Sequence, residues 1–432
     1  MKNDIVHGIC SDITVDGQGV VKVGSLVIFV KDLIPGEEAD IKIVSLKKNY
    51  AYGIIDKLTK PSTNRIDSIC PISYKCGGCD FRYIDYDYQL VLKKQLLENT
   101  FRSLDVEVLD VIRSEDSIYY RNKSQIPIRD HKFGFYRHYS NDIVEFQECY
   151  IQSQLTNSLF NFIKNQMLEL NIDKYFRHIV IKHAFNTNQV MVGLVSYTKE
   201  IPLINDLIDS ITKKFSEVKS IVLNINNKET NVILGEEDIV LYGNSYIIDE
   251  FDNLRFKISL KSFYQTNYKQ MINLYSKVKE YAYIDSSSNV LDLYSGIGTI
   301  SLYLSRYAKH VTGVEIVEDA VKNADENKRL NNIANVDFYL DDASKNFKNY
   351  IKGIDVLIVD PPRKGLSKEL INELNSSNID RIVYVSCNPA TLARDLELFK
   401  TSYSFDRIQP VDMFPYTKHI ECVVSMQRKD NK

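Results

Sequence analysis

Residues 289–304, NVLDLYSGIGTISLYL, decide the fold of this chain. An apolar strand runs into a turn with glycines at 296 and 298, and an apolar helix follows. Glycine lets the backbone approach a ligand closely, and the helix N-terminus adds partial positive charge. About twenty residues later HVTGVE ends a second strand at Glu315, which is well placed to accept hydrogen bonds from ribose hydroxyls. The stretch therefore predicts a site for a nucleoside-containing cofactor.

A nicotinamide-binding domain and an S-adenosylmethionine-binding domain both have this outline. Ser301 stands where the dinucleotide fingerprint has its third glycine, and Asp292 would lie poorly beside a pyrophosphate. A ligand with an ammonium and a sulfonium suits Asp292 better, so the loop favours a methyltransferase over a dehydrogenase. In DVLIVDPPRKGL, Asp360 and two prolines end another apolar strand, at the edge where open sheets bind ligands.

The pattern around this stretch predicts three domains in the 432 residues. Residues 1–60 hold short strands with Gly/Pro turns, typical of a small β-barrel. Residues 61–260 predict an α+β domain with β-like runs such as NVILG (residues 231–235), and a helix near 86–104 that packs on the catalytic domain. Residues 261–432 alternate strands and helices, which predicts a parallel, doubly wound α/β sheet.

Composition limits the class of protein. Apolar residues make up 44% and charged residues 26%, no apolar run is long enough to span a membrane, and the N-terminus lacks a signal-peptide pattern. We therefore expect a cytoplasmic protein without membrane contact, monomeric by default. The net charge of −3 argues weakly against nucleic acid, but residues 120–138 interleave cations with aromatic rings. That mixture suits phosphate neutralisation and base stacking, although a solvated strand and turn is an equal alternative.

A cysteine and a glutamate are also predicted to lie on buried strands, near the edge of the sheet where ligands bind. VYVSCNPATLARDL places Cys387 at the end of a buried strand and before a helix, whose terminus could lower the pKa of the thiol. KHIECVVSM places Glu421 on the last strand. Most isolated cysteines are buried hydrophobes. A thiol and a carboxylate in one pocket are, however, what methylation of uracil carbon 5 needs: the thiolate adds to carbon 6, and a base later removes the carbon 5 proton.

Five motifs in order resemble the RNA 5-methyluridine methyltransferase family over nearly the whole chain. They are SFYQTN at 262–267, DLYSGIGTISL at 292–302, VDPPRKGL at 359–366, SCNPATLARD at 386–395 and HIECVV at 419–424. The resemblance implies a Rossmann-like S-adenosylmethionine methyltransferase domain, with Cys387 as nucleophile and Glu421 as the base. It also implies cofactor contacts from Gln265, Tyr294, Glu315 and Asp360, and more loosely from Asp342.

Four other cysteines suggest a metal centre. Cys70, Cys76 and Cys79 lie close together in the sequence, with Cys149 further on. From spacing alone, a structural zinc comes first and an iron–sulfur cluster second. The spacing is similar to the family branch that binds a [4Fe-4S] cluster, which reverses that order and implies an iron–sulfur central domain.

The N-terminal segment looks like the TRAM domain of this family, a barrel of the oligonucleotide-binding kind. Family branches that modify transfer RNA usually lack both the barrel and the cysteines, so the resemblance implies 23S ribosomal RNA as the substrate. Transfer RNA methylation by the same chemistry is one alternative. A catalytically idle RNA-binding assembly factor is another.

Overall fold

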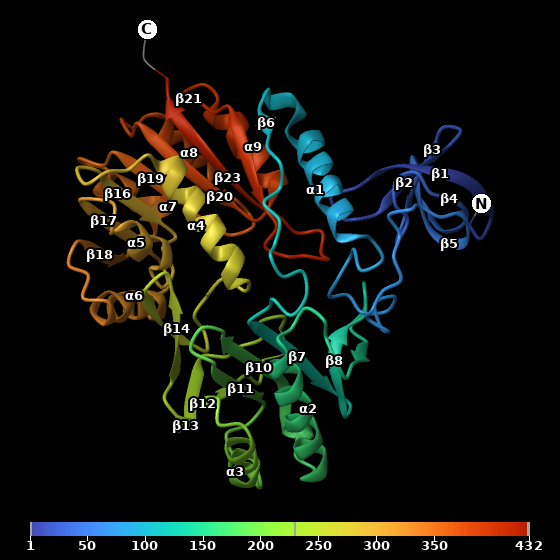
Figure 1. The fold of residues 1–432 in the computed structure, drawn as a ribbon, viewed down its shortest axis with the longest axis horizontal. Coiled ribbons are helices and arrows are strands. Elements are labelled where there is room, and N and C mark those ends of the chain that lie inside the picture. Colours follow the sequence, from blue (N-terminus) through green and yellow to red (C-terminus); the bar gives the residue numbers. More distant parts are fainter. Residues whose placement is uncertain (1, 229, 430–432) are drawn as a thin grey trace.

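The computed structural model describes residues 2–228 and 230–429. Figure 1 shows a small N-terminal barrel beside α1, a central α+β part, and a C-terminal part with a large sheet. No helix in the described ranges is both long and apolar enough to cross a membrane.

The N-terminal part is a closed barrel in the order β1-β2-β3-β5-β4, in which β3 and β5 are parallel and the other neighbours antiparallel. Its strands are β1 (Ile5–Ile13), β2 (Gly19–Val23), β3 (Leu26–Val30), β4 (Glu38–Leu46) and β5 (Tyr50–Lys60). Alternate residues such as Ile28, Val30 and Ala51 fill the interior and are fully buried. The predicted N-terminal barrel is confirmed.

The central part is a sheet in the order β13-β12-β11-β10-β7-β8-β9, with two helices on it. The elements are β7 (Lys123–Arg129), β8 (Lys132–Tyr136), β9 (Ile143–Glu145), α2 (Gln154–Glu169), β10 (Phe176–Ala184), β11 (Gln189–Ser196), α3 (Ile204–Lys214), β12 (Val218–Ile225) and β13 (Glu237–Gly243). The prediction of a β-run at NVILG is wrong, because a side chain, and not a neighbouring strand, hydrogen-bonds to the backbone of this segment. The Asn226 amide binds the carbonyls of Val232 and Ile233, so the segment is a loop.

Of the four aromatic residues predicted to form a stacking surface in 120–138, only Tyr136 is exposed, at 43%. Tyr120 and Phe133 are buried, and Phe135 stacks on Phe146 with ring centroids 4.7 Å apart. Burial also lowers the pKa of Lys123, with Arg121 adding to the effect. Phe133 and Phe135 of β8 belong to the core that α2 covers, whereas Tyr120 precedes β7 and donates its hydroxyl to the Pro415 carbonyl at 3.0 Å.

The C-terminal sheet has the order β18-β17-β16-β19-β20-β23-β22-β6, with β21 beside β23. Its elements are α4 (Tyr268–Ala282), β16 (Asn289–Leu293), α5 (Thr299–Leu304), β17 (His310–Glu315), α6 (Glu318–Leu330), β18 (Val336–Leu340), α7 (Ala343–Asn346), β19 (Val356–Val359), α8 (Lys368–Asn375), β20 (Arg381–Ser386), α9 (Pro389–Phe399), β21 (Tyr403–Ser404), β22 (Arg407–Val411) and β23 (Glu421–Arg428). Strands β18 to β20 are parallel and β23 is antiparallel to β20. The predicted Rossmann-like sheet is confirmed, and its strand order reverses between β16 and β19.

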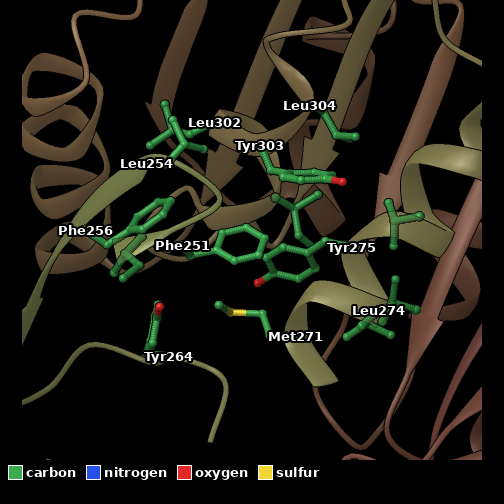
Figure 2. Packing of buried hydrophobic residues seen from close by; sticks show 14 of the residues in the cluster. Phe251, Leu254, Phe256, Tyr264, Met271, Leu274, Tyr275, Leu302, Tyr303 and Leu304 are labelled. Atoms are coloured by element: carbon green, nitrogen blue, oxygen red, sulfur yellow. The ribbon is translucent and has the colours of Figure 1, made fainter. Parts of the chain in front are cut away.

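A hairpin of β14 (Tyr246–Phe251) and β15 (Leu254–Ser259) packs on this sheet domain rather than on the central sheet alone. Figure 2 shows its Phe251 among the rings of Tyr275 and Tyr303. The Phe251 centroid lies 5.5 Å from each of them. The cluster supports the start of α5, since the Tyr275 hydroxyl lies 2.7 Å from Thr299 Oγ1.

Helix α1 (Tyr86–Phe101) and strand β6 (Glu107–Val108) join the barrel to the C-terminal sheet. Asp85 caps α1 by accepting the N–H groups of Asp87 and Tyr88. Inside, Lys93 Nζ lies 2.6 Å from Asp412 Oδ1, and neither side chain is exposed. Tyr86 donates to the other carboxylate oxygen at 2.9 Å. The helix is therefore fixed by a buried, hydrogen-bonded ion pair.

We expect Lys93→Met to destabilise the protein by about 3–5 kcal/mol, because it leaves the Asp412 charge buried without a cation. The neighbouring Lys94→Met is the matched control. Lys94 pairs with Asp110, whose side chain is 94% exposed, so its loss should cost under about 1 kcal/mol. Urea denaturation checks both variants. Equal losses of stability in the two variants would contradict the claim that the buried Lys93–Asp412 ion pair fixes α1.

Candidate active site

The turn after β16 has the backbone of a ligand cradle. Tyr294, Gly296 and Gly298 have φ angles of +66°, +56° and +81°. A Cβ on Gly298 would meet the Phe338 ring at 2.5 Å, whereas a Cβ on Gly296 would meet nothing within 4 Å. Gly298 is thus required by packing. Gly296 borders open space.

Two acidic residues flank this turn. Glu315, at the end of β17, accepts the Gly296 N–H on Oε2 at 3.0 Å, and on Oε1 it accepts the N–H groups of Ile316 and Val317 at 2.9 Å. Asp292 on β16 accepts the Ser301 hydroxyl at 2.5 Å, but its Oδ1 and the nearby Ser295 Oγ are buried without a partner. Buried polar atoms of this kind require a partner, and a ligand ammonium would supply one. The donor set therefore fits an aminoacyl-bearing cofactor better than a pyrophosphate.

Two other predicted cofactor residues, Tyr294 and Asp342, follow the carboxyl ends of β16 and β18 and so lie at the same edge of the sheet. Tyr294 is half-buried, and burial raises its pKa to about 12, with Asp342 and Glu315 among the smaller causes. Asp342 caps α7 by accepting the Ser344 N–H, and that serine with Lys345 lowers its pKa. Gln265 lies in the link before α4, where its carbonyl accepts from the Asn122 amide at 2.9 Å. Its side chain is buried.

Cys387 and Glu421 lie at the same end of the sheet. Strands β20 and β23 are antiparallel with Ser386 opposite Cys422, so Cys387 and Glu421 are the next residues outward on each strand. Cys387 is half-buried and Glu421 is buried. Neighbouring strand ends thus bring together two residues that are 34 positions apart in the chain, 421 against 387.

Burial dominates the electrostatics of this pair. It raises the pKa of Cys387 to about 11, with the charges of Glu421 and Asp360 adding to the rise and Arg363 opposing it. Burial and Asp360 also raise the pKa of Glu421, again against Arg363. The pKa of Asp360 rises to about 7 on burial. The expectation that the helix terminus lowers the thiol pKa is therefore wrong, because burial and two neighbouring carboxylates raise it.

Cys387 opens on a cavity of about 240 Å³ that the catalytic domain shares with α1 and the barrel. Val15 and Asp16 of the β1–β2 turn lie on one side of it. The other lining residues are Lys93, Leu96, Leu97, Thr100, Arg363, Asn388, Pro389, Ala390, Lys418, His419 and Ile420. An ion pair of 3.0 Å between Lys418 Nζ and Asp16 Oδ1 ties the barrel to this wall. The cavity is the candidate entrance for a substrate.

Three polar residues of this cavity, Arg363, Asn388 and His419, were not predicted as site residues. The Arg363 carbonyl accepts the Asn388 amide at 2.9 Å, and its guanidinium Nη2 lies 3.4 Å from Nδ1 of His419. Burial lowers the pKa of His419 to about 4, with Arg363 adding to the effect. Each residue stands inside or beside a quoted motif, which was the available signal. Phe263, two residues before Gln265, was also missed and is 66% exposed.

The four cysteines predicted as metal ligands line one cavity of about 180 Å³. All are free thiols, and burial raises the pKa of Cys76 and Cys149 to about 11 and that of Cys79 to about 12. Arg82 lines the same cavity with its Nε and Nη1 buried and unpartnered. However, no group of three or more His, Cys, Asp or Glu in residues 2–228 and 230–429 is arranged to hold a metal ion. The four cysteine sulfurs thus share one cavity, and the iron–sulfur cluster stays a prediction.

Known RNA methyltransferases are similar to this chain over nearly its whole length. The family model for tRNA (uracil-5-)-methyltransferase matches residues 85–429. An uncharacterised RNA methyltransferase of Bacillus cereus is 41% identical, over 99% of this chain and 97% of its own. One of Clostridium acetobutylicum is 40% identical, over 96% and 95%. The crystal structure of Pyrococcus abyssi tRNA (uracil-54, C5)-methyltransferase with S-adenosyl-L-homocysteine superposes with a TM-score of 0.81 at 30% identity, covering 97% of this chain and 99% of that one.

Proposed function

Because this chain belongs to the tRNA (uracil-5-)-methyltransferase family, we propose that Cys387 and Glu421 carry out its S-adenosylmethionine-dependent methylation of uracil carbon 5 in RNA. The observation that carries the proposal is the placement of both side chains at adjacent strand ends beside Asp360 and Arg363. Methyl incorporation into purified RNA from labelled S-adenosylmethionine tests it. A chain that transfers no methyl to any RNA would instead be the idle assembly factor.

In the proposed reaction Cys387 first gives its proton to solvent, and the thiolate sulfur then bonds to carbon 6 of the uracil ring. The electron pair displaced from the carbon 5–carbon 6 double bond makes carbon 5 nucleophilic. S-adenosylmethionine, when bound, supplies the electrophilic methyl group. Glu421 then takes the proton from carbon 5, the ring double bond re-forms, and Cys387 leaves as the thiolate. A carboxylate with a raised pKa suits this step, since it is a stronger base than a solvated one.

Arg363 is proposed to position and activate the thiol. It is the cation that opposes the rise in pKa of both Cys387 and Glu421. Its backbone is fixed by the Asn388 amide and by the Thr391 hydroxyl at 3.2 Å. A guanidinium at this place favours the thiolate over the thiol, which the addition to carbon 6 requires.

For the cofactor we propose contacts from Gln265, Tyr294, Glu315 and Asp360, and a looser one from Asp342. The unpartnered Asp292 Oδ1 and the open space at Gly296 support a ligand at this edge. Glu315 retains acceptor capacity on Oε2, which receives one backbone N–H.

We expect Glu315→Gln to weaken S-adenosylmethionine binding by about 10- to 100-fold, since hydrogen bonds to a charged acceptor contribute about 1.5–3 kcal/mol. Titration calorimetry with the purified variant measures the loss. Glu318→Gln is the matched control, because Glu318 is exposed and pairs with Lys322 on α6. An unchanged affinity of the Glu315 variant would remove this residue from the cofactor site.

The proposed RNA is 23S ribosomal RNA, by the resemblance that the sequence carries. Transfer RNA is a second candidate, which the similarity to the P. abyssi enzyme favours. That enzyme acts on transfer RNA, and its structure covers 97% of this chain. The presence of a barrel therefore does not argue for ribosomal RNA. Mapping 5-methyluridine in both RNAs from cells with and without this chain separates the candidates. We expect it to act as a monomer in the cytoplasm.

A [4Fe-4S] cluster on Cys70, Cys76, Cys79 and Cys149 is proposed as a structural or RNA-positioning group, with zinc as the alternative. The shared cavity supports it, and so does Arg82, whose Nε and Nη1 are buried beside the thiols without a hydrogen-bond partner, because thiolates bound to iron leave net negative charge for a cation to offset. We expect anaerobically purified protein to contain iron and sulfide, and Cys76→Ala to lose both. Cys10→Ala, inside the barrel core, should lose neither. Protein that holds zinc and no iron would contradict the cluster.

A further inference from the structure

A buried lysine of the central sheet holds the bend (residues 259–262) that precedes Gln265. Lys182 lies on β10 and is 4% exposed. Its Nζ donates to the carbonyls of Ser259 at 2.6 Å and of Ser262 at 2.8 Å. Among the described residues it has no carboxylate partner, and burial, with the nearby Lys123 adding to the effect, lowers its pKa. Charged or neutral, an amine has at least two N–H donors, so it can serve both carbonyls.

The side-chain hydroxyls of the same bend are held by the catalytic domain. Asn323 on α6 donates its amide to the hydroxyls of Ser259 at 3.3 Å and of Ser262 at 3.2 Å. These two hydroxyls lie 2.7 Å apart. One turn further along α6, the Asn327 amide donates to the Ile297 carbonyl at 3.1 Å, inside the glycine turn after β16. The bend is therefore bonded to the central sheet through its carbonyls and to the helix that supports the cofactor turn through its hydroxyls.

The chain that follows the bend is fixed as far as Thr266. Tyr264 is buried in the cluster of Figure 2, with its ring centroid 6.4 Å from that of Phe256. Asn122, just before β7, donates its amide to the Gln265 carbonyl and its backbone N–H to the Thr266 carbonyl, each at 2.9 Å. The central sheet therefore holds the backbone both before and after Gln265, which leaves the side chain of this residue one defined position.

We infer that Lys182 is a positioning residue for the cofactor site, which acts through the 259–262 bend on Gln265. The inference rests on the proposed function, in which Gln265 contacts S-adenosylmethionine. Lysine is almost never fully buried without a partner. Here both of its partners are carbonyls of one bend, 77 and 80 residues further along the chain. A side chain of the central domain thereby sets the place of a cofactor contact in the catalytic domain.

Titration calorimetry of the full chain with S-adenosylmethionine tests the inference. Lys182→Met keeps an apolar stem but removes the N–H donors. It should weaken cofactor binding about 10- to 100-fold, since displacement of a positioned group by about 1 Å can cost about 100-fold. Asn323→Ala releases the same bend from α6 and should also weaken binding. Lys261→Met is the matched control, because Lys261 belongs to the bend but its side chain is 26% exposed and pairs with Asp238. It should change the affinity less than about twofold.

A double-variant cycle separates positioning from a merely structural role. Gln265→Ala removes the proposed cofactor contact itself, so adding Lys182→Met to it should weaken binding less than about threefold further. A structural defect would instead multiply with the loss from Gln265→Ala. If Lys182→Met fails to fold, Asn323→Ala takes its place in the cycle, because Asn323 is only half-buried on α6.

Three results would overturn the inference: unchanged affinity of the Lys182 and Asn323 variants, full multiplication of the losses in the cycle, or an equal loss in Lys261→Met. Cofactor binding is measured without RNA, so failure of the methylation proposal would show separately. An unmodified chain that transfers no methyl group, in a series with the expected affinities, would refute the proposed reaction and leave the role of Lys182 standing.

Discussion

Cys387→Ala is expected to lower methyl transfer to RNA by at least about 1000-fold. Without the sulfur that adds to carbon 6, carbon 5 of uracil remains a poor nucleophile toward any methyl donor, and loss of a covalent nucleophile costs several orders of magnitude. The alanine removes one half-buried side chain at the end of β20, so the fold and cofactor binding should persist. Transfer of labelled methyl groups to purified RNA measures the loss, with binding of S-adenosylmethionine measured on the same preparation.

Cys422→Ala is the matched control for this variant. Cys422 lies opposite Ser386 in the sheet, one step from the site, and is fully buried. Burial raises the pKa of its thiol, so it stays protonated and acts as a small apolar side chain. We expect it to retain methyl transfer. Near-normal turnover by Cys387→Ala would rule out the covalent mechanism.

Glu421→Gln is expected to stop the reaction one step later, with the methylated RNA still bonded to Cys387. The amide has the shape of the carboxylate but accepts no proton from carbon 5, so elimination stalls and turnover falls by about 100- to 10,000-fold. The substitution also removes a negative charge that raises the pKa of Cys387, which helps the thiolate form. A denaturing gel of protein and labelled RNA should show a stable complex.

The complex requires both residues, so the double variant Cys387→Ala/Glu421→Gln should form none. Glu397→Gln is a control for the loss of one carboxylate on the neighbouring helix, since Glu397 is exposed on α9 and pairs with Lys400. It should turn over normally without trapping RNA. A Glu421→Gln protein that turns over at the normal rate would assign proton removal to another group.

The parts of the fold predicted from sequence are those with strong local patterns. The apolar strands at 289–293 and 356–359 and the glycine turn after the first one identify the Rossmann-like sheet, because buried parallel strands are continuous apolar runs. NVILG is also a short, mostly apolar run, but it is a loop in which the Asn226 side-chain amide donates to the carbonyls of Val232 and Ile233. Hydrogen bonds from a side chain to the backbone of another segment leave no periodic pattern in the sequence. The composition of NVILG alone therefore could not show that it is a loop.

The site was predictable only where its residues stand in motifs. Cys387 and Glu421 belong to such motifs, but the cavity beside Cys387 also takes Val15 from the barrel and Leu96 from α1. Those contacts depend on how the barrel, α1 and the sheet pack, which sequence spacing does not contain. The thiol pKa was predicted in the wrong direction for a similar reason. The helix end is visible in sequence, whereas burial beside Glu421 and Asp360 is a tertiary property.

The central claim is a covalent bond between Cys387 and carbon 6 of the target uracil. The most direct test uses 5-fluorouridine in the RNA that methylation mapping identifies, because fluorine at carbon 5 cannot leave as a proton and the enzyme remains attached. With S-adenosylmethionine present, mass spectrometry of the digested complex should find methylated fluorouridine on the peptide that contains Cys387. A complex linked through a different residue, or no covalent complex from an enzyme that methylates ordinary RNA, would contradict the claim.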